Sequence, residues 1–388
     1  MKRISVIIKN DGEDMKGEFL SAHNRLLNLT KVTSEYSFNP VIIKTYDGFC
    51  VRILKRQKKR ELYENKMYEG VNYRIFWVKS SLIDIILSRI GIQRIVIYIR
   101  LMRLLNYFNT SNLIIAHSTY PAWLANECKK KYGIPFCVTW HGSDIHTTPW
   151  ESKENLKQAK EIITNADINL FVSQNLLNKS NLITKSARKL VLYNGVDQAK
   201  FYQFPISLKE ICKDKFQIKN TLNVAFIGNL FPIKNVLSLP QIFEALTYTL
   251  DDVCLHIIGD GPLLKALQEV IMQKKLNVRF WGNQSPSEIP SIINIMDIIL
   301  LPSLNEGLPL IALESIACGT PMVSSNVGGL SEVLGKENVF DLDDDFIRKV
   351  TERCTDIIKN NISPSPLSSR FIWTDIAKKE LDIIQKVI

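Results

Sequence analysis

The sequence lacks any ordered cysteine pattern, any long apolar run and any internal repeat. Its seven cysteines are scattered over 388 residues without a C-x-x-C spacing. That argues against a disulfide framework or a zinc ribbon and fits free thiols in a reducing compartment. No stretch approaches 18 uncharged apolar residues, and the first apolar run, Ile4–Ile8, is too short for a signal-peptide core. We therefore expect a cytoplasmic protein, either soluble or bound peripherally at the inner face of a membrane.

Acidic residues are scarce in one segment. The net charge is +10, and residues 51–107 hold 13 Lys and Arg against 4 Asp and Glu, a balance of +9. Six of these cations lie in Val51–Arg60, and Leu82–Tyr107 is predicted to be a helix. Such asymmetry favours an anionic partner, and we expect peripheral contact with an anionic membrane through 51–107. The alternative is that this helix packs on the sheet with a narrow polar stripe.

Short runs of Val, Ile, Leu and Phe alternate with helical patterns, as is typical of parallel strands buried on both faces. The first predicted strands are Ile4–Ile8, Val41–Thr45, Tyr73–Val78, Leu113–Ala116, Phe136–Trp140, Ile168–Val172 and Leu190–Tyr193. After Phe201–Asn220, interpreted as the interdomain connection, they are Val224–Ile227, Cys254–Ile258, Val278–Trp281, Ile298–Leu301 and Met322–Ser324. This order predicts an α/β protein with an N-terminal domain, 1–204, and a C-terminal domain, 205–372.

The segment 302–314, Pro-Ser-Leu-Asn-Glu-Gly-Leu-Pro-Leu-Ile-Ala-Leu-Glu, carries the strongest chemical signal. It follows a predicted strand, so Glu306 falls in the loop at the strand end. Glu306 and Glu314, eight positions apart, supply carboxylates for sugar and ribose hydroxyls. The alternative is a solvated loop glutamate and a surface helix glutamate.

The same loop opens a predicted helix. Gly307 permits a close backbone approach, Pro309 suits the first helical turn, and Gly319 ends the helix. The free N–H groups of Gly307, Leu308 and Leu310 would form an anion site suited to a diphosphate.

Two further strand ends lie in this half. The strand Val224–Ile227 ends in Gly228 and Asn229, and a short loop then places Lys234, whose ammonium can neutralise phosphate charge. A surface lysine is the alternative. The turn Gly259-Asp260-Gly261-Pro262 is not G-x-G-x-x-G, so a structural turn is the better interpretation.

In the first half, His141 follows the strand Phe136–Trp140 and His117 follows Leu113–Ala116. Both should stand at the carboxyl edge of a parallel sheet, where ligands bind in such folds. A metal site is not predicted. Asp341-Leu342-Asp343 resembles a metal-binding D-x-D motif, but it precedes a helix whose N-terminus favours acidic residues.

Five motifs in order resemble the retaining GT-B glycosyltransferases of family 4, the glycosyltransferase group 1 family. They are His141-Gly142-Ser143-Asp144, Asn194-Gly195-Val196-Asp197, Gly259-Asp260-Gly261-Pro262, Glu306 with Glu314, and Val327-Gly328-Gly329-Leu330. The resemblance implies two Rossmann-like domains whose parallel sheets face each other across a cleft. It also implies that Lys234 binds the diphosphate, Glu314 the ribose and Glu306 the transferred sugar, with His141 beside the reacting centre.

The resemblance implies further positions. The nucleotide base would lie along Gly282 and Asn283, and the final helix, 373–388, would cross back onto the N-terminal domain. This chain departs from the family at Asn229, where an Arg is usual, so one phosphate-binding cation is missing. The loop after the first strand has Gly12 and Gly17 in place of an adjacent glycine pair, and Gly17 is the candidate donor contact there.

We therefore expect transfer of a sugar from a nucleotide diphosphate sugar, such as a UDP- or GDP-linked hexose, with retention and without a metal. The acceptor, a carbohydrate or lipid-linked hydroxyl, would sit mainly on the N-terminal domain. The resemblance implies bacterial surface-polysaccharide or lipopolysaccharide synthesis, and no nucleic-acid partner is expected. The alternatives are a non-catalytic binding protein of this fold, which Asn229 favours, and a two-Rossmann sugar-nucleotide epimerase.

Overall fold

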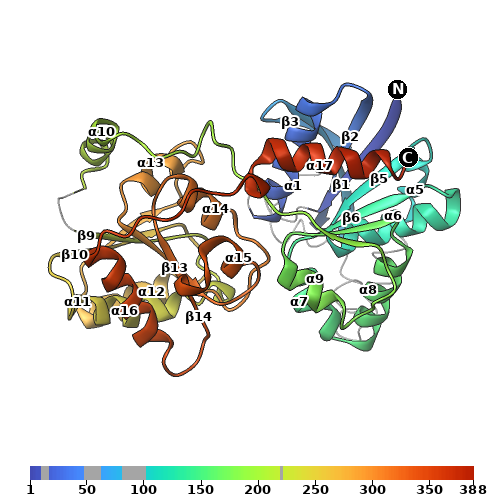
Figure 1. The fold of residues 1–388 in the computed structure, drawn as a ribbon. Coiled ribbons are helices and arrows are strands. Elements are labelled where there is room, and N and C mark those ends of the chain that lie inside the picture. Colours follow the sequence, from blue (N-terminus) through green and yellow to red (C-terminus); the bar gives the residue numbers. More distant parts are fainter. Residues whose placement is uncertain (10–16, 48–62, 81–101, 219–221) are drawn as a thin grey trace. The chain divides into compact units, whose positions relative to one another are not determined.

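The computed structural model describes residues 1–9, 17–47, 63–80, 102–218 and 222–388. The chain divides into two compact units. The N-terminal unit comprises 1–172, 176–192 and 376–388, and the C-terminal unit comprises 173–175 and 193–375. Each unit is built on its own sheet, with helices on both faces (Figure 1).

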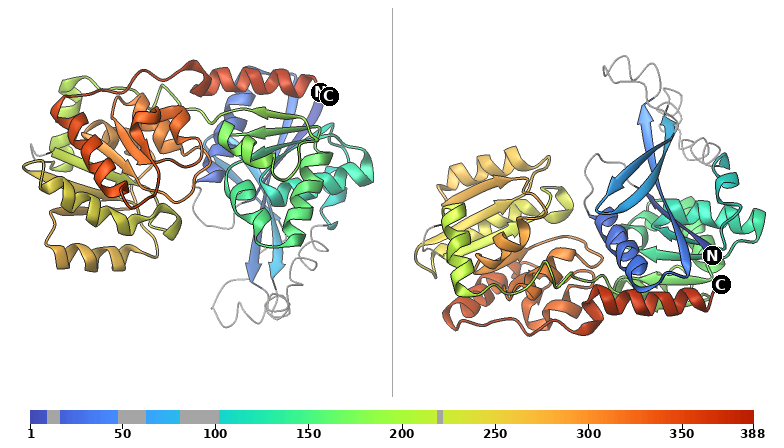
Figure 2. Two further views of the ribbon diagram at one scale, coloured as in Figure 1. Left: turned by 60° about the horizontal axis from the view of Figure 1, so that its bottom comes forward. Right: turned by 90° about the horizontal axis from the view of Figure 1, so that it is seen from above.

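The sheet of the N-terminal unit has the strand order β3-β4-β2-β1-β5-β6-β7-β8. Its strands are β1 (Lys2–Lys9), β2 (Tyr36–Asp47), β3 (Tyr63–Tyr68), β4 (Val71–Ser80), β5 (Leu113–His117), β6 (Phe136–Trp140), β7 (Ile168–Phe171) and β8 (Lys189–Val191). All described pairings are parallel except that of β3 with β4. β2 and β4 run side by side and extend past the body of the unit (Figure 2).

The helices of the first half are α1 (Glu18–Val32), α5 (Leu105–Phe108), α6 (Thr119–Tyr132), α7 (Ser143–His146), η1 (Thr148–Trp150), α8 (Lys153–Asn165) and α9 (Gln174–Ser180). β1, β5 and β6 are buried on both faces, which explains why their sequences are continuous apolar runs.

The sheet of the C-terminal unit has the order β11-β10-β9-β12-β13-β14, with every described pairing parallel. Its strands are β9 (Leu222–Ile227), β10 (Val253–Ile258), β11 (Val278–Gly282), β12 (Ile298–Leu301), β13 (Met322–Ser325) and β14 (Val339–Phe340). The remaining helices are α10 (Ile206–Phe216), η2 (Pro232–Lys234), η3 (Val236–Ser238), α11 (Leu239–Thr247), α12 (Leu264–Lys274), α13 (Ile289–Asn294), α14 (Leu310–Ala317), α15 (Leu330–Leu334), η4 (Lys336–Asn338), α16 (Phe346–Lys359), η5 (Ser369–Phe371) and α17 (Trp373–Gln385).

Both sheets are doubly wound, and this confirms the predicted pair of Rossmann-like domains. In each, the chain builds one side of the first strand and then crosses to the other, so β1 neighbours β5 and β9 neighbours β12. The loops that follow these neighbouring strands diverge to opposite faces and leave room for a ligand at the carboxyl edge. We call these two places the N-terminal and the C-terminal switch point.

The boundary between the units differs from the expected 204/205. The division falls at 192/193, and the segment interpreted as the interdomain connection is part of the C-terminal unit. It contains α10, whose Cys212 and Phe216 pack with Phe204 in the core of that unit. The helix was missed because its apolar side is narrow and its sequence is rich in lysine.

The last helix returns to the N-terminal unit, since residues 376–388 belong to it. Glu380 of α17 pairs with Arg25 of α1 at 3.0 Å, and both side chains are at most 2% exposed. A buried ion pair of this kind is strongly destabilising to break from one side, so it fixes the helix on this unit.

Candidate active site

The C-terminal switch point brings Lys234 and Glu306 together. Lys234 ends η2 in the loop after β9, and Glu306 lies in the loop after β12. The Lys234 Nζ is 2.5 Å from Glu306 Oε1, and their side chains are 22% and 10% exposed. The two loops are also joined through the backbone, because the Leu304 N–H donates to the Ile233 carbonyl at 2.8 Å. A cation and a carboxylate are thus held at the carboxyl edge of the sheet.

Ser303 is a member of this cluster that sequence reasoning missed. Its Oγ donates to Glu306 Oε1 at 2.7 Å, so one carboxylate oxygen receives both the hydroxyl and the Lys234 ammonium. The available signal was a serine three positions before a loop glutamate, a spacing that lets the side chain turn back. Ser303 is fully buried and positions Glu306.

Backbone donors lie next to this pair, at the start of α14. Within the described residues, the N–H groups of Gly307, Leu308 and Leu310 donate no hydrogen bond, as expected at a helix N-terminus. Pro309 was expected in the first helical turn, but it caps the helix in an extended conformation, with φ −69° and ψ 133°. The helix therefore begins at Leu310, and the N–H groups with the helix dipole favour an anion there.

Glu314 lies on α14 and is half-buried. Burial raises its pKa to about 7. Its carboxylate has no hydrogen bond or ion pair to any described residue. A carboxylate left in this state gains from hydroxyl donors, because each hydrogen bond to its charged form restores lost solvation.

Glycines brace the loops of this switch point. A Cβ on Gly328, whose φ is +57°, would collide with the Glu306 carbonyl, and the Gly329 N–H donates to the Gly307 carbonyl at 2.7 Å. The motif 327–330 therefore packs directly on the Glu306 loop. The backbone there can approach this closely only because the side chain is absent.

The other predicted donor-site positions follow β9 and end β11. The Gly228 N–H donates to the Ile258 carbonyl at 2.9 Å, and Asn229 follows it. Gly282 ends β11 and is separated from β9 by β10, so Gly282 and Asn283 lie farther along the same edge. A Cβ on Gly259 would strike the Gly228 carbonyl, which supports the structural interpretation of the 259–262 turn.

The N-terminal switch point holds a pair of neutral histidines. His117 ends β5, His141 follows β6, and the His117 Nδ1 is 3.1 Å from the His141 Nε2. Burial and the nearby Arg25 lower the pKa of His141 to about 3, and burial and His141 lower that of His117 well below its usual value. Both rings are therefore neutral near pH 7, and one of them donates to the other.

Asp144 joins this pair to a pocket in the same unit. Its carboxylate accepts from the His141 N–H at 3.2 Å and from the Thr119 N–H at 3.4 Å, and burial raises its pKa. The pocket has a volume of about 460 Å³ and lies at the ends of β1, β5 and β6. Gly17, with φ +60°, is the N-cap of α1 beside the pocket residue Glu18.

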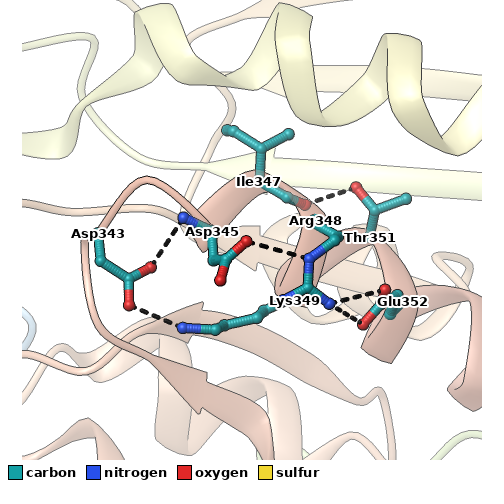
Figure 3. A network of polar contacts seen from close by, with 7 residues as sticks. All are labelled: Asp343, Asp345, Ile347, Arg348, Lys349, Thr351 and Glu352. Carbon is teal, nitrogen blue, oxygen red and sulfur yellow. Dashed lines mark hydrogen bonds and ion pairs between the residues drawn. The ribbon is translucent and has the colours of Figure 1, made fainter.

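The acidic run at 341–345 is engaged at the start of α16. Asp343 pairs with Lys349 at 2.7 Å and Asp345 with Arg348 at 3.1 Å (Figure 3). Asp341 accepts from Asn326 at 2.9 Å. In the part of the chain that the structure describes, no three His, Cys, Asp or Glu gather as metal ligands would. Asp343 of the D-x-D pattern thus pairs with the first turn of α16, whereas Asp341 bonds Asn326.

The predicted membrane-contact segment lies largely outside the described residues, which omit 48–62 and 81–101. Tyr73, which lies within the segment 51–107, is fully buried on β4, and its hydroxyl bonds His23 Nδ1 at 2.9 Å. It is therefore a core residue. None of the described helices has the length and apolar character required to cross a membrane.

Residues 209–368 match the family model of the glycosyl transferases group 1. The chain is 28% identical over 228 residues to an uncharacterized glycosyltransferase of Methanocaldococcus jannaschii, a match covering 58% of each chain. It is 29% identical over 235 residues to the UDP-Gal:α-D-GlcNAc-diphosphoundecaprenol α-1,3-galactosyltransferase of Escherichia coli, covering 56% of this chain and 58% of that one. The chain thus spans less than two thirds of the length of either relative.

Among solved structures, HepE of Anabaena in complex with UDP is similar over 100% of both chains, with 17% identity and a TM-score of 0.74. This likeness shows the fold, which is GT-B. Residues 209–368 are thus similar to the group 1 glycosyl transferases, and the whole chain has the GT-B fold.

Proposed function

We propose that this protein transfers a sugar from a nucleotide diphosphate sugar to an acceptor hydroxyl, with retention at the anomeric carbon, as in family 4. The observation that carries the proposal is the C-terminal switch point. A lysine paired with a carboxylate lies there beside free N–H groups at the start of α14. Glu314, whose carboxylate has no partner among the described residues, follows on the same helix. The similar Anabaena protein was solved with UDP and with UDP-glucose, which favours a UDP- or GDP-linked hexose as donor here.

Each group has a role in this proposal. Lys234 and the N–H groups of 307, 308 and 310 hold the diphosphate, Glu314 accepts from the ribose hydroxyls, and Glu306 accepts from the transferred sugar. When the diphosphate binds, the Lys234 ammonium turns from Glu306 to a phosphate oxygen. The carboxylate of Glu306 is then released for the sugar, while Ser303 keeps its orientation.

The chemical step needs no side-chain nucleophile. The acceptor oxygen attacks the anomeric carbon on the face that the nucleotide leaves, the bond from that carbon to the phosphate oxygen breaks, and the acceptor proton passes to the departing phosphate. The products are a glycoside with the donor's configuration and a nucleoside diphosphate. His141, neutral at pH 7, orients the sugar by hydrogen bonding.

Transfer is proposed to be independent of metal, because Lys234 and the α14 N-terminus supply positive charge where the diphosphate would lie. Activity should survive EDTA; loss that Mg²⁺ or Mn²⁺ restores would refute this. The Escherichia coli relative acts on a diphosphoundecaprenol-linked sugar, which favours a lipid-linked acceptor and a place in surface-polysaccharide synthesis.

We also propose that the protein works in the cytoplasm, at the inner face of the membrane, through the basic segment 51–107. Co-sedimentation with anionic and neutral vesicles tests this. Binding should need anionic lipid and should fall when the cations of Val51–Arg60 become glutamine.

Asn229 favours a second candidate, a non-catalytic binding protein of this fold, because the family's usual Arg is absent there. A panel of UDP- and GDP-linked hexoses and N-acetylhexosamines separates the two. The enzyme should release nucleoside diphosphate and give a product whose anomeric configuration, read by NMR, matches that of the donor. Donor binding without release under any acceptor would favour the second candidate, and an inverted product would exclude retention.

A further inference from the structure

The pocket at the N-terminal switch point has a charge opposite to that of the protein. The whole chain carries +10. Among the described residues that line the pocket, in contrast, Glu18, Asp144 and Glu151 supply carboxylates and Lys9 supplies a cation. The Lys9 Nζ lies 5.2 Å from the centre of the Tyr120 ring, which holds it against one wall. Acid therefore outnumbers base where the overall composition predicts the reverse.

The rest of the lining suits hydroxyl groups. The lining also contains hydroxyls that donate as well as accept hydrogen bonds, from Ser118, Thr119, Ser143 and Thr148. The pocket volume of about 460 Å³ is within the range of small-ligand pockets. Hydroxyls and carboxylates together complement a ligand that presents many O–H donors. A phosphate group brings acceptors alone, so it would leave these carboxylates facing further negative charge.

Asp144 links the pocket to the predicted reacting centre of this unit. Its carboxylate lines the pocket and accepts from the His141 backbone N–H at 3.2 Å. A ligand in the pocket would therefore be separated from the His141 backbone by the Asp144 side chain alone. Burial raises the pKa of Asp144, because desolvation disfavours its charged form.

We propose that this pocket receives the acceptor as an uncharged, hydroxyl-bearing sugar ring and discriminates against a phosphorylated one. The proposal rests on the proposed function, in which the acceptor sits on the N-terminal unit, and adds the chemical class of that acceptor. Any phosphate of a lipid-linked acceptor must then lie outside the pocket.

Direct binding tests this without a transfer assay. The probes are methyl glycosides of glucose, galactose, mannose and N-acetylglucosamine, together with their 6-phosphates, followed by saturation-transfer NMR on the full chain. At least one methyl glycoside should bind, and its 6-phosphate should bind about tenfold more weakly because of the excess carboxylate charge.

The matched variants are Glu151→Lys, which changes the pocket, and Glu154→Lys, which makes the same charge change at an exposed position of α8 outside the lining. Glu151→Lys should bring the affinities of the two probes to within about threefold, and Glu154→Lys should leave the difference unchanged.

Equal or tighter binding of the 6-phosphate by the parent would overturn the proposal. So would binding by no methyl glycoside, or an equal effect of both variants. UDP and GDP binding in the same samples reports on the donor site, so failure of the proposed function is seen separately.

Discussion

The two switch points use one scaffold for different chemistry. In the C-terminal unit a lysine, a helix N-terminus and braced loops converge on a place suited to a diphosphate. In the N-terminal unit a neutral histidine pair borders a pocket with more carboxylates than cations. Strand order creates the place for a ligand in both, whereas the loop residues decide its charge.

The two units also differ in how closely their glycines are packed. In the C-terminal unit, Gly259, Gly261, Gly328 and Gly329 press against neighbouring loops. In the described part of the N-terminal unit, a Cβ on Gly17, Gly70 or Gly133 would meet nothing within 4 Å. The loops that carry Glu306 and the 259–262 turn are thus tightly packed, although Gly282 at the same edge has open space around it. Substitutions can therefore break one unit's site without touching the other.

The largest effect is expected from Gly328→Ala. The added Cβ would strike the Glu306 and Gly307 carbonyls at φ +57°, so the loop must move, at an expected cost above about 3 kcal/mol. Gly133→Ala is the control. It has φ +71° with open space around it and should cost only about 1 kcal/mol. Thermal unfolding and nucleotide binding measure both, and similar losses in the two variants would show that the loop is not braced.

Lys234→Ala should come next. Removing the ammonium takes a charge-assisted contact from the diphosphate, worth about 1.5–3 kcal/mol, so affinity for the nucleoside diphosphate should fall tenfold or more. Lys9→Ala removes a cation that lines the pocket at the other switch point and should leave that affinity unchanged. Calorimetry on both variants is the measurement. If Lys9→Ala weakened binding as much as Lys234→Ala, the contrast between the two switch points would be wrong.

His141→Ala tests the N-terminal switch point. Loss of an oriented hydrogen bond to the sugar should lower kcat by about tenfold or more, with only a small change in thermal midpoint. Because the pKa of His141 is held at about 3, the rate of the parent should show no histidine titration near pH 6.5. A step in the rate near that pH that disappears in the variant would show that the ring is protonated in use.

The sequence predicted most of the scaffold because buried parallel strands are long enough and apolar enough to stand out. β6 and β12 have the predicted bounds, and the other predicted strands shift by a few residues at most, apart from β2, which begins earlier at Tyr36. β3 was missed because Tyr63–Met67 is exposed, and β14 because it has two residues. A strand without a buried face leaves no periodic pattern to read.

The site was predictable at strand ends and not beyond them. Residues that directly follow a predicted strand could be selected as site candidates, because parallel strands end at one edge of the sheet. Lys234, Glu306, His117 and His141 were found in this way. No local pattern encodes the histidine pair, the role of Ser303 or the bracing of Glu306 by Gly328, since each depends on segments far apart in sequence. The contact of the Tyr73 hydroxyl with His23, 50 positions away, likewise has no local signal.

The effect expected at Glu314 depends on pH and has a defined sign. Its pKa is about 7 in the folded protein, against about 4.3 for an unperturbed glutamate. Between these values the folded state holds a proton that the unfolded state has lost, so stability falls as pH rises through this window and is constant above it. Glu314→Gln removes this pH dependence. At pH 8 it should raise the free energy of unfolding by up to about 3 kcal/mol, and with it the thermal midpoint, whereas at pH 4.5 it should change both little. Glu269→Gln, at an exposed position of α12, should show no such difference.

The same Glu314→Gln protein should bind nucleoside diphosphate more weakly, because the amide is a poorer acceptor for ribose hydroxyls. A variant more stable at pH 8 yet unchanged in nucleotide binding would confine Glu314 to the core and remove it from the donor site.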